Sequence, residues 1–170
     1  MKKKLYIAYG SNINLEQMAH RCPHSRVVGT AMIPDYELQF RNVATIFPKP
    51  GAEVPVLLWE IPPRDERNLD VYEGFPRLYR TENLEFEFNG QTVTGMAYVM
   101  NYGSISPPST GYYECIRKGY LTNGMDTKYL DQALVNSYQP DADVSFQQEE
   151  TEDQEDGLSE EDGWSFWGTM

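Results

Sequence analysis

The sequence predicts an α+β fold: a small, curved, mostly antiparallel β-sheet or barrel with flanking helices. Three observations support this class. Strand-like segments joined by turn residues fill the first hundred residues, segments with helical apolar spacing follow them, and no internal repeat is present. Because most of the predicted strands are joined by hairpin turns, a doubly wound parallel sheet is the less favoured alternative.

Charge divides the chain into two parts. The formal net charge is −12, and residues 141–170 contain 11 acidic residues and no basic one. Residues 1–140 hold all 14 Lys and Arg, with a net charge of −1. We therefore expect one folded domain over 1–140 and an acidic, flexible tail over 141–170. The terminal Trp164-Ser165-Phe166-Trp167 permits two interpretations, a docking peptide for a protein partner or a solvated chain end.

Composition also argues against several classes of partner. The predicted domain does not concentrate Lys and Arg on any segment, so no nucleic-acid partner is expected. The apolar segment behind Lys2-Lys3-Lys4 is shorter than an export signal, and no segment is long and apolar enough to cross a membrane. We therefore expect a cytoplasmic protein with no membrane partner. The sequence leaves open whether it is a monomer or a homodimer.

Three potential metal ligands lie close together at His20, Cys22 and His24. Pro23 interrupts any helix that would align them, and no fourth ligand is near in the sequence. We therefore predict no metal site and no cofactor, and we interpret this segment as the loop at the end of a helix.

The first predicted strand is Leu5–Tyr9, which is apolar at every position, as in a central strand covered on both faces. It stops at Gly10-Ser11-Asn12. Gly10 permits a positive φ or a close backbone approach, and the N–H groups of such a loop suit a carboxylate or a developing oxyanion. An ordinary strand-to-turn junction is the alternative. A short helix follows, with Asn14 and Gln17 as a capping box.

The sequence of residues 26–74 predicts three strands followed by one helix. Residues 26–47 predict two strands joined by a turn at Pro34-Asp35, and Pro48–Gly51 predicts a loop. Another strand is expected over Val54–Ile61. The helix begins at Pro62-Pro63 and ends at Gly74.

The remaining elements are a hairpin and two helices. Asn89-Gly90, between strands at Tyr79–Phe88 and Thr92–Met100, is the strongest two-residue hairpin signal in the chain. Helical patterns follow at Tyr112–Leu121 and Thr127–Ser137.

Glu73 lies at the end of the predicted middle helix, directly before Gly74. The carboxyl end of a helix slightly disfavours a negative charge, and burial beside Tyr72 and Phe75 would disfavour it more. Both effects raise the pKa of Glu73 toward a value that suits proton transfer near neutral pH. The alternative is an exposed acid at a helix end.

Several of these segments together resemble a known family. Tyr9-Gly10-Ser11-Asn12, the segment Leu69–Gly74 and Tyr79-Arg80 are similar to the Y-G-S-N loop and D-x-x-E-G motif of the γ-glutamyl cyclotransferase family (AIG2-like, γ-glutamylamine cyclotransferase superfamily). Gly29–Phe40 is similar to its second strand pair, and Ala97–Tyr112 to its tyrosine-bearing strand and loop. The resemblance covers roughly residues 4–137 and leaves out the acidic tail.

The resemblance implies an activity. In this family the α-amine of a γ-glutamyl group attacks its own γ-carbonyl, which releases 5-oxoproline and a free amine or amino acid. The substrate brings the nucleophile, so no catalytic Ser, Cys or His is needed. The implied general acid and base is Glu73, and the small-molecule γ-glutamyl substrate would be bound by Tyr9, Gly10, Ser11, Asn12, Tyr79, Tyr98 and Tyr112. For each of these tyrosines, a core position with a satisfied hydroxyl is the alternative.

A second hypothesis remains open at this point. The same fold would serve as a non-catalytic module that binds a small carboxylate ligand, with the acidic tail docking a protein partner. The position of Glu73 discriminates between the two, because a carboxylate that points to bulk solvent would disfavour an enzyme.

Overall fold

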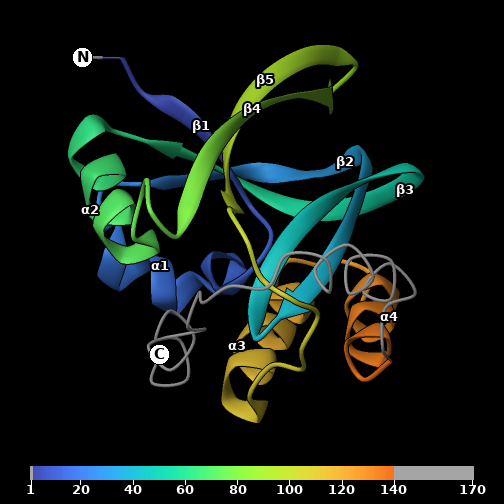
Figure 1. The fold of residues 1–170 in the computed structure, drawn as a ribbon. Helices are drawn as coiled ribbons and strands as arrows, with labels where there is room; N and C mark the ends of the chain where they lie inside the picture. The colour runs from blue at the N-terminus through green and yellow to red at the C-terminus, as the bar shows by residue number, and fades with distance from the viewer. Residues whose placement is uncertain (1, 140–170) are drawn as a thin grey trace, which may run out of the picture.

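The computed structural model describes residues 2–139 and confirms the α+β class. Five strands form one sheet in the order β2-β3-β1-β5-β4, in which only the β1–β5 pair is parallel (Figure 1). The strands are β1 (Lys4–Ala8), β2 (Arg26–Arg41), β3 (Val43–Ile61), β4 (Tyr79–Phe88) and β5 (Gln91–Met100). The central strand β1 ends in a buried segment, as its continuous apolar sequence predicts.

The sheet is curved and open. Its edge strands β2 and β4 share no ladder of hydrogen bonds in the described part of the chain, so the barrel is not closed. The edges nevertheless approach each other, because a Cβ atom at Gly29 of β2 would lie 3.1 Å from the ring of Phe88 in β4. The predicted hairpin between β4 and β5 is confirmed, with positive φ angles of 50° at Asn89 and 78° at Gly90.

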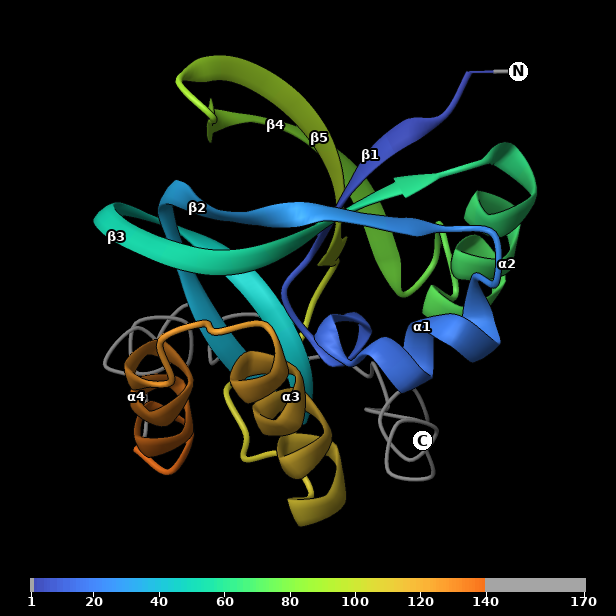
Figure 2. The ribbon, with the colours of Figure 1, turned by 180° about the vertical axis from the view of Figure 1, so that it is seen from behind.

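The prediction for residues 26–61 is wrong in two respects. We expected a turn at Pro34-Asp35, but β2 continues through these residues and turns into β3 at Asn42, where φ is 70°. The predicted loop at Pro48–Gly51 lies within β3 as a bulge, since pairing passes from Tyr36 opposite Pro48 to Pro34 opposite Glu53. The result is one long hairpin whose far half bends toward the carboxyl-terminal helices (Figures 1 and 2).

The helices lie in two groups. One group is α1 (Leu15–Arg21) and α2 (Pro63–Glu73), which are neighbours; the other is α3 (Thr110–Thr122) and α4 (Lys128–Ser137), beside the bent half of the β2–β3 hairpin (Figure 2). A short 3₁₀-helix, η1 (Ser11–Ile13), connects β1 to α1 and packs against α3. The strand end at Ala8 therefore lies between the two groups of helices.

Close packing of α3 on η1 makes Gly119 sensitive to substitution. A Cβ atom there would lie 2.7 Å from the Ile13 side chain and 2.9 Å from the Asn14 backbone nitrogen. We expect Gly119→Ala to destabilise the protein by roughly 1–3 kcal/mol, because overpacking outweighs the better helix propensity of alanine. The matched control is Gly111→Ala in the same helix, where a Cβ atom meets nothing within 4 Å. Thermal denaturation of both variants tests this, and equal melting temperatures would contradict it.

The predicted tail at 141–170 and its terminal aromatic residues lie outside the described residues, as does the position of the predicted domain boundary. Among the helices of the described part, none has the length and apolar character needed to cross a membrane.

Candidate active site

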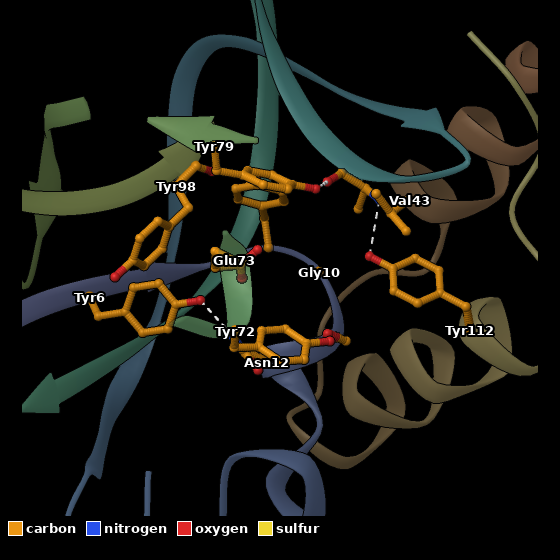
Figure 3. Close-up of a pocket in the computed structure, with 12 residues that line it drawn as sticks. Tyr6, Gly10, Asn12, Val43, Tyr72, Glu73, Tyr79, Tyr98 and Tyr112 are labelled. Atoms are coloured by element: carbon orange, nitrogen blue, oxygen red, sulfur yellow. Dashed lines mark hydrogen bonds between the residues drawn. The ribbon is translucent and has the colours of Figure 1, made fainter. Parts of the chain in front are cut away.

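A pocket opens beside the end of β1, where the strand meets η1 (Figure 3). The space inside it that protein atoms do not fill, including the solvent at its mouth, is about 510 Å³. It is lined by Tyr6, Tyr9, Gly10, Ser11, Asn12, Val43, Ala44, Tyr72, Glu73, Tyr79, Tyr98 and Tyr112. The structure therefore brings all the site residues predicted from sequence to one cavity.

The loop after β1 forms one wall of the pocket. Gly10 has φ −113°, so of the two expected uses of this glycine the structure shows the close approach rather than a positive φ. A Cβ atom at this position would lie 3.3 Å from the Tyr112 hydroxyl and 3.3 Å from the Ala44 Cβ. Within the described residues, the amide N–H groups of Gly10, Ser11 and Asn12 donate to no protein acceptor. This wall thus offers unpaired donors of the kind that bind carboxylates and oxyanions.

Glu73, the last residue of α2, lines the same pocket as this loop. The helix ends there because Gly74 adopts the left-handed conformation with φ 64°, and its amide bonds back to the carbonyl of Val71 at 3.2 Å. The Glu73 side chain is half-buried, and burial raises its pKa to about 7, partly offset by the positive charge of Arg21. Among the described residues its carboxyl group has no hydrogen-bond partner.

Two tyrosine hydroxyls are held by the backbone of one residue, Ala44, at the start of β3. The Tyr79 hydroxyl donates to the Ala44 carbonyl at 3.2 Å, and the Ala44 amide donates to the Tyr112 hydroxyl at 3.0 Å (Figure 3). The hydroxyl proton of Tyr79 is therefore already donated to a protein acceptor. Tyr112 accepts this bond and keeps its own proton for a ligand in the pocket.

The other two predicted tyrosines contribute mainly their rings. The Tyr9 hydroxyl donates to the backbone carbonyl of Tyr98, and the Tyr98 hydroxyl donates to Asp70 at 2.5 Å. The ring of Phe75, which we expected beside Glu73, instead packs edge-on against Tyr98 with a centroid distance of 6.5 Å. The rings of Tyr9 and Tyr98 thus line the same pocket as Glu73.

Sequence reasoning did not name Tyr6, Val43 and Ala44 as site residues, and it expected Tyr72 beside Glu73 without assigning it to the site. It also missed Arg21, the last residue of α1, whose guanidinium group bonds to Ser11 and Asn12 and stacks on Tyr72. The proximity of Tyr72 to Glu73 in sequence was an available signal. Nothing in the local sequence pairs Arg21 with the loop, because this contact depends on how α1 turns back beside η1.

The His20–His24 segment has structural contacts. Asp65, which is buried, accepts hydrogen bonds from the His24 amide at 2.9 Å and the Ser25 hydroxyl at 2.9 Å, and the Cys22 thiol lies 3.6 Å from the Asp65 carbonyl. These bonds join the end of α1 to the first turn of α2. No group of three or more potential metal ligands comes together in the part of the chain that the structure describes.

The fold and the pocket define a small α+β domain with a half-buried carboxylate in its pocket, and comparison with known proteins identifies its relatives. The family model "Gamma-glutamyl cyclotransferase, AIG2-like" matches residues 6–119. The γ-glutamylcyclotransferase of Bos taurus is 32% identical over 164 residues, which cover 88% of this chain and 86% of the relative. The Homo sapiens γ-glutamylcyclotransferase is 29% identical over 163 residues, with the same coverage of both chains.

Solved structures agree with the sequence comparison. The solved structure of a γ-glutamyl cyclotransferase superposes with a TM-score of 0.72 at 26% identity, covering 94% of this chain and 95% of the other. This chain belongs to the γ-glutamyl cyclotransferase, AIG2-like family. Family membership in turn implies a small γ-glutamyl compound as ligand.

Proposed function

We propose that the protein is a γ-glutamyl cyclotransferase that cleaves a γ-glutamyl amide and releases 5-oxoproline, with Glu73 as general acid and base. The observation that carries this proposal is the half-buried Glu73 carboxyl group, which faces the pocket with a pKa near 7 and no protein hydrogen-bond partner among the described residues. A group that titrates near neutral pH is suited to accept and return a proton.

The pocket supports the cyclisation by holding the substrate in a curled conformation. The α-amine must approach the γ-carbonyl carbon, and an intramolecular attack of good geometry is worth several kcal/mol. The unpaired amides of Gly10, Ser11 and Asn12 bind either the α-carboxylate or the oxyanion that forms on the γ-carbonyl oxygen. The rings of Tyr9, Tyr79 and Tyr98 and the hydroxyl of Tyr112 enclose the group.

Glu73 moves the protons. Its carboxylate accepts a proton from the substrate ammonium group, so that the free amine forms a bond to the γ-carbon. The protonated Glu73 then donates this proton to the departing nitrogen as the bond between that nitrogen and the γ-carbon breaks, and the regenerated carboxylate accepts the second proton from the attacking nitrogen. The attacking nitrogen ends as the lactam N–H of 5-oxoproline. The departing amine takes this second proton from Glu73 and becomes ammonium, which leaves Glu73 as a carboxylate for the next cycle.

The test is the release of 5-oxoproline from a panel of γ-glutamyl amino acids, γ-glutamylamines and ε-(γ-glutamyl)lysine isopeptides. We expect at least one class to be turned over, and the most active class identifies the leaving amine. If no member releases 5-oxoproline while a γ-glutamyl compound still raises the melting temperature, the protein is a binding module and the proposal is wrong.

A further inference from the structure

Arg21 connects two segments that line the pocket, the loop after β1 and the end of α2. Its guanidinium nitrogen Nη1 donates to Ser11 Oγ at 3.0 Å and to Asn12 Oδ1 at 2.5 Å, while Nη2 donates to Gln17 at 2.8 Å. The same group lies 3.6 Å from the centroid of the Tyr72 ring, next to Glu73. One side chain thus contacts both the loop after β1 and the end of α2.

The contact with Arg21 determines which way the Asn12 side-chain amide faces. A guanidinium group has donors and no acceptor, so the atom of Asn12 that faces it must be the oxygen. The Asn12 nitrogen Nδ2 therefore faces the other way, and it lies 2.8 Å from the Tyr6 hydroxyl (Figure 3). Asn12 is buried, and its backbone carbonyl accepts a bond from the Trp59 indole at 3.0 Å, which fixes the residue further.

The same reasoning extends to Tyr6. Because Nδ2 of Asn12 is a donor, the Tyr6 oxygen accepts this bond, and its own proton must be donated elsewhere. No described protein group accepts that proton, and Tyr6 lines the pocket. The direction of the hydrogen bonds is thereby fixed from Arg21 to Asn12, from Asn12 to Tyr6, and from Tyr6 into the cavity.

We propose that Tyr6 donates a hydrogen bond to an oxygen atom of the γ-glutamyl substrate, and that Arg21 is the positioning residue that imposes this direction through Asn12. This inference rests on the proposed function, and it adds a donor on a strand residue to the donors of the loop. The substrate oxygen is either the γ-carbonyl oxygen or an α-carboxylate oxygen, both of which are acceptors.

Arg21 is also a cation whose charge acts on Glu73. Its charge lowers the pKa of Glu73, while burial raises it. The other titratable groups around Glu73 are neutral tyrosines whose own pKa values are raised by burial: Tyr6 from β1, Tyr9 directly after β1, Tyr72 from α2, Tyr79 from β4, Tyr98 from β5 and Tyr112 from α3. Asp70, on the same helix as Glu73, is bonded to Tyr98. Arg21 thus also tunes the proton affinity of the proposed base.

A double-mutant cycle between Tyr6 and Asn12 tests the direction of the bonds. Tyr6→Phe is expected to lower kcat/KM about 10²-fold, as for the loss of one oxyanion donor. Asn12→Asp replaces the donor Nδ2 with a carboxylate, which accepts from Tyr6 and withdraws its proton from the pocket. In the Asn12→Asp background, Tyr6→Phe should therefore cost less than about twofold. Additive losses in the cycle would overturn the proposal.

Variants of Arg21 test the positioning role. Arg21→Met frees the Asn12 amide to reverse, so the cost of Tyr6→Phe should fall below about tenfold in this background. The loss of positive charge should also move the acid limb of the kcat/KM profile to higher pH. Arg21→Lys keeps a charged donor without an acceptor, and it should keep both the limb and the cost of Tyr6→Phe. A merely structural role would predict neither the coupling nor the shift.

A measurement without turnover separates this inference from the proposed function. In ¹⁵N-labelled protein, the Asn12 side-chain amide resonances should shift strongly in Tyr6→Phe and in Arg21→Met, because each variant removes a partner of that amide. Unchanged resonances in both folded variants would overturn the inference. If the resonances shift in both variants while the wild-type protein releases no 5-oxoproline, the bonding order from Arg21 through Asn12 to Tyr6 stands and the proposed function is wrong.

Discussion

Replacing Glu73 with glutamine is expected to reduce kcat for 5-oxoproline release by roughly 10²–10⁴-fold, the usual contribution of general acid–base catalysis. Glutamine has nearly the same shape, so the pocket should still bind the substrate, but it cannot accept the proton of the attacking amine. KM should change much less than kcat. The measurement is steady-state kinetics with the best substrate of the panel.

The pH dependence gives this experiment a second readout. Burial raises the pKa of Glu73 to about 7, and only the carboxylate form acts as a base. For the wild-type protein, kcat/KM should therefore fall about tenfold for each pH unit below 7. This limb should be absent from the residual activity of Glu73→Gln.

A matched control is available on the same helix. Glu66 lies two turns before Glu73 and forms an ion pair with Lys4 at 2.6 Å, away from the pocket. Glu66→Gln makes the same chemical change, so we expect it to retain the activity and the pH profile. If Glu73→Gln retains them as well, Glu73 is not the general base.

The sequence predicted the segments that build the pocket because their signals are local. The apolar segment before Gly10 defines a central strand end, and Gly74 defines the end of the helix that carries Glu73. Asn89-Gly90 likewise suits only a tight hairpin turn. At Gly74 and at Asn89-Gly90 the backbone adopts positive φ angles that most residue types avoid, so the local sequence alone indicates where the helix ends and where the hairpin turns.

The failed turn at Pro34-Asp35 shows where local signals become ambiguous. Asp35 does adopt a positive φ of 61°, as in many turns, and its carboxylate accepts a bond from the Gly51 amide at 2.9 Å. This contact joins the two predicted turn segments across the hairpin, so each becomes one side of a bulge. Only the pairing of two segments distant in sequence distinguishes a bulge from a pair of turns.

The hydrogen-bond network of the pocket could not be predicted from the sequence for a related reason. The family resemblance led to Tyr79 and Tyr112, but their hydroxyls depend on the backbone of Ala44, which has no side-chain signal. The contact of Arg21 with the pocket loop could not be predicted either, because it depends on the direction in which α1 continues after η1. Contacts made by backbone groups or by long side chains across elements leave no pattern in the sequence.

Glu73→Gln should also make the protein more stable at alkaline pH. The pKa of this carboxyl group is about 7 in the folded protein, against an ordinary value of 4.5. Between these values the folded state binds more protons than the unfolded state, so the free energy of unfolding falls as pH rises. Above pH 7 the full penalty is present, and it is at most roughly 3 kcal/mol for such a shift. Glutamine carries no charge and removes the penalty.

The expected result is a melting temperature for Glu73→Gln that exceeds that of the wild-type protein by several degrees at pH 8 and by much less at pH 5. Glu66→Gln should behave in the opposite way at pH 8, because it breaks an ion pair with Lys4 and removes no buried charge. Equal melting temperatures of Glu73→Gln and wild type at pH 8 would mean that the Glu73 charge is well solvated. A variant that gains stability as it loses turnover would show that the protein keeps a destabilising charge in its pocket for the sake of the reaction.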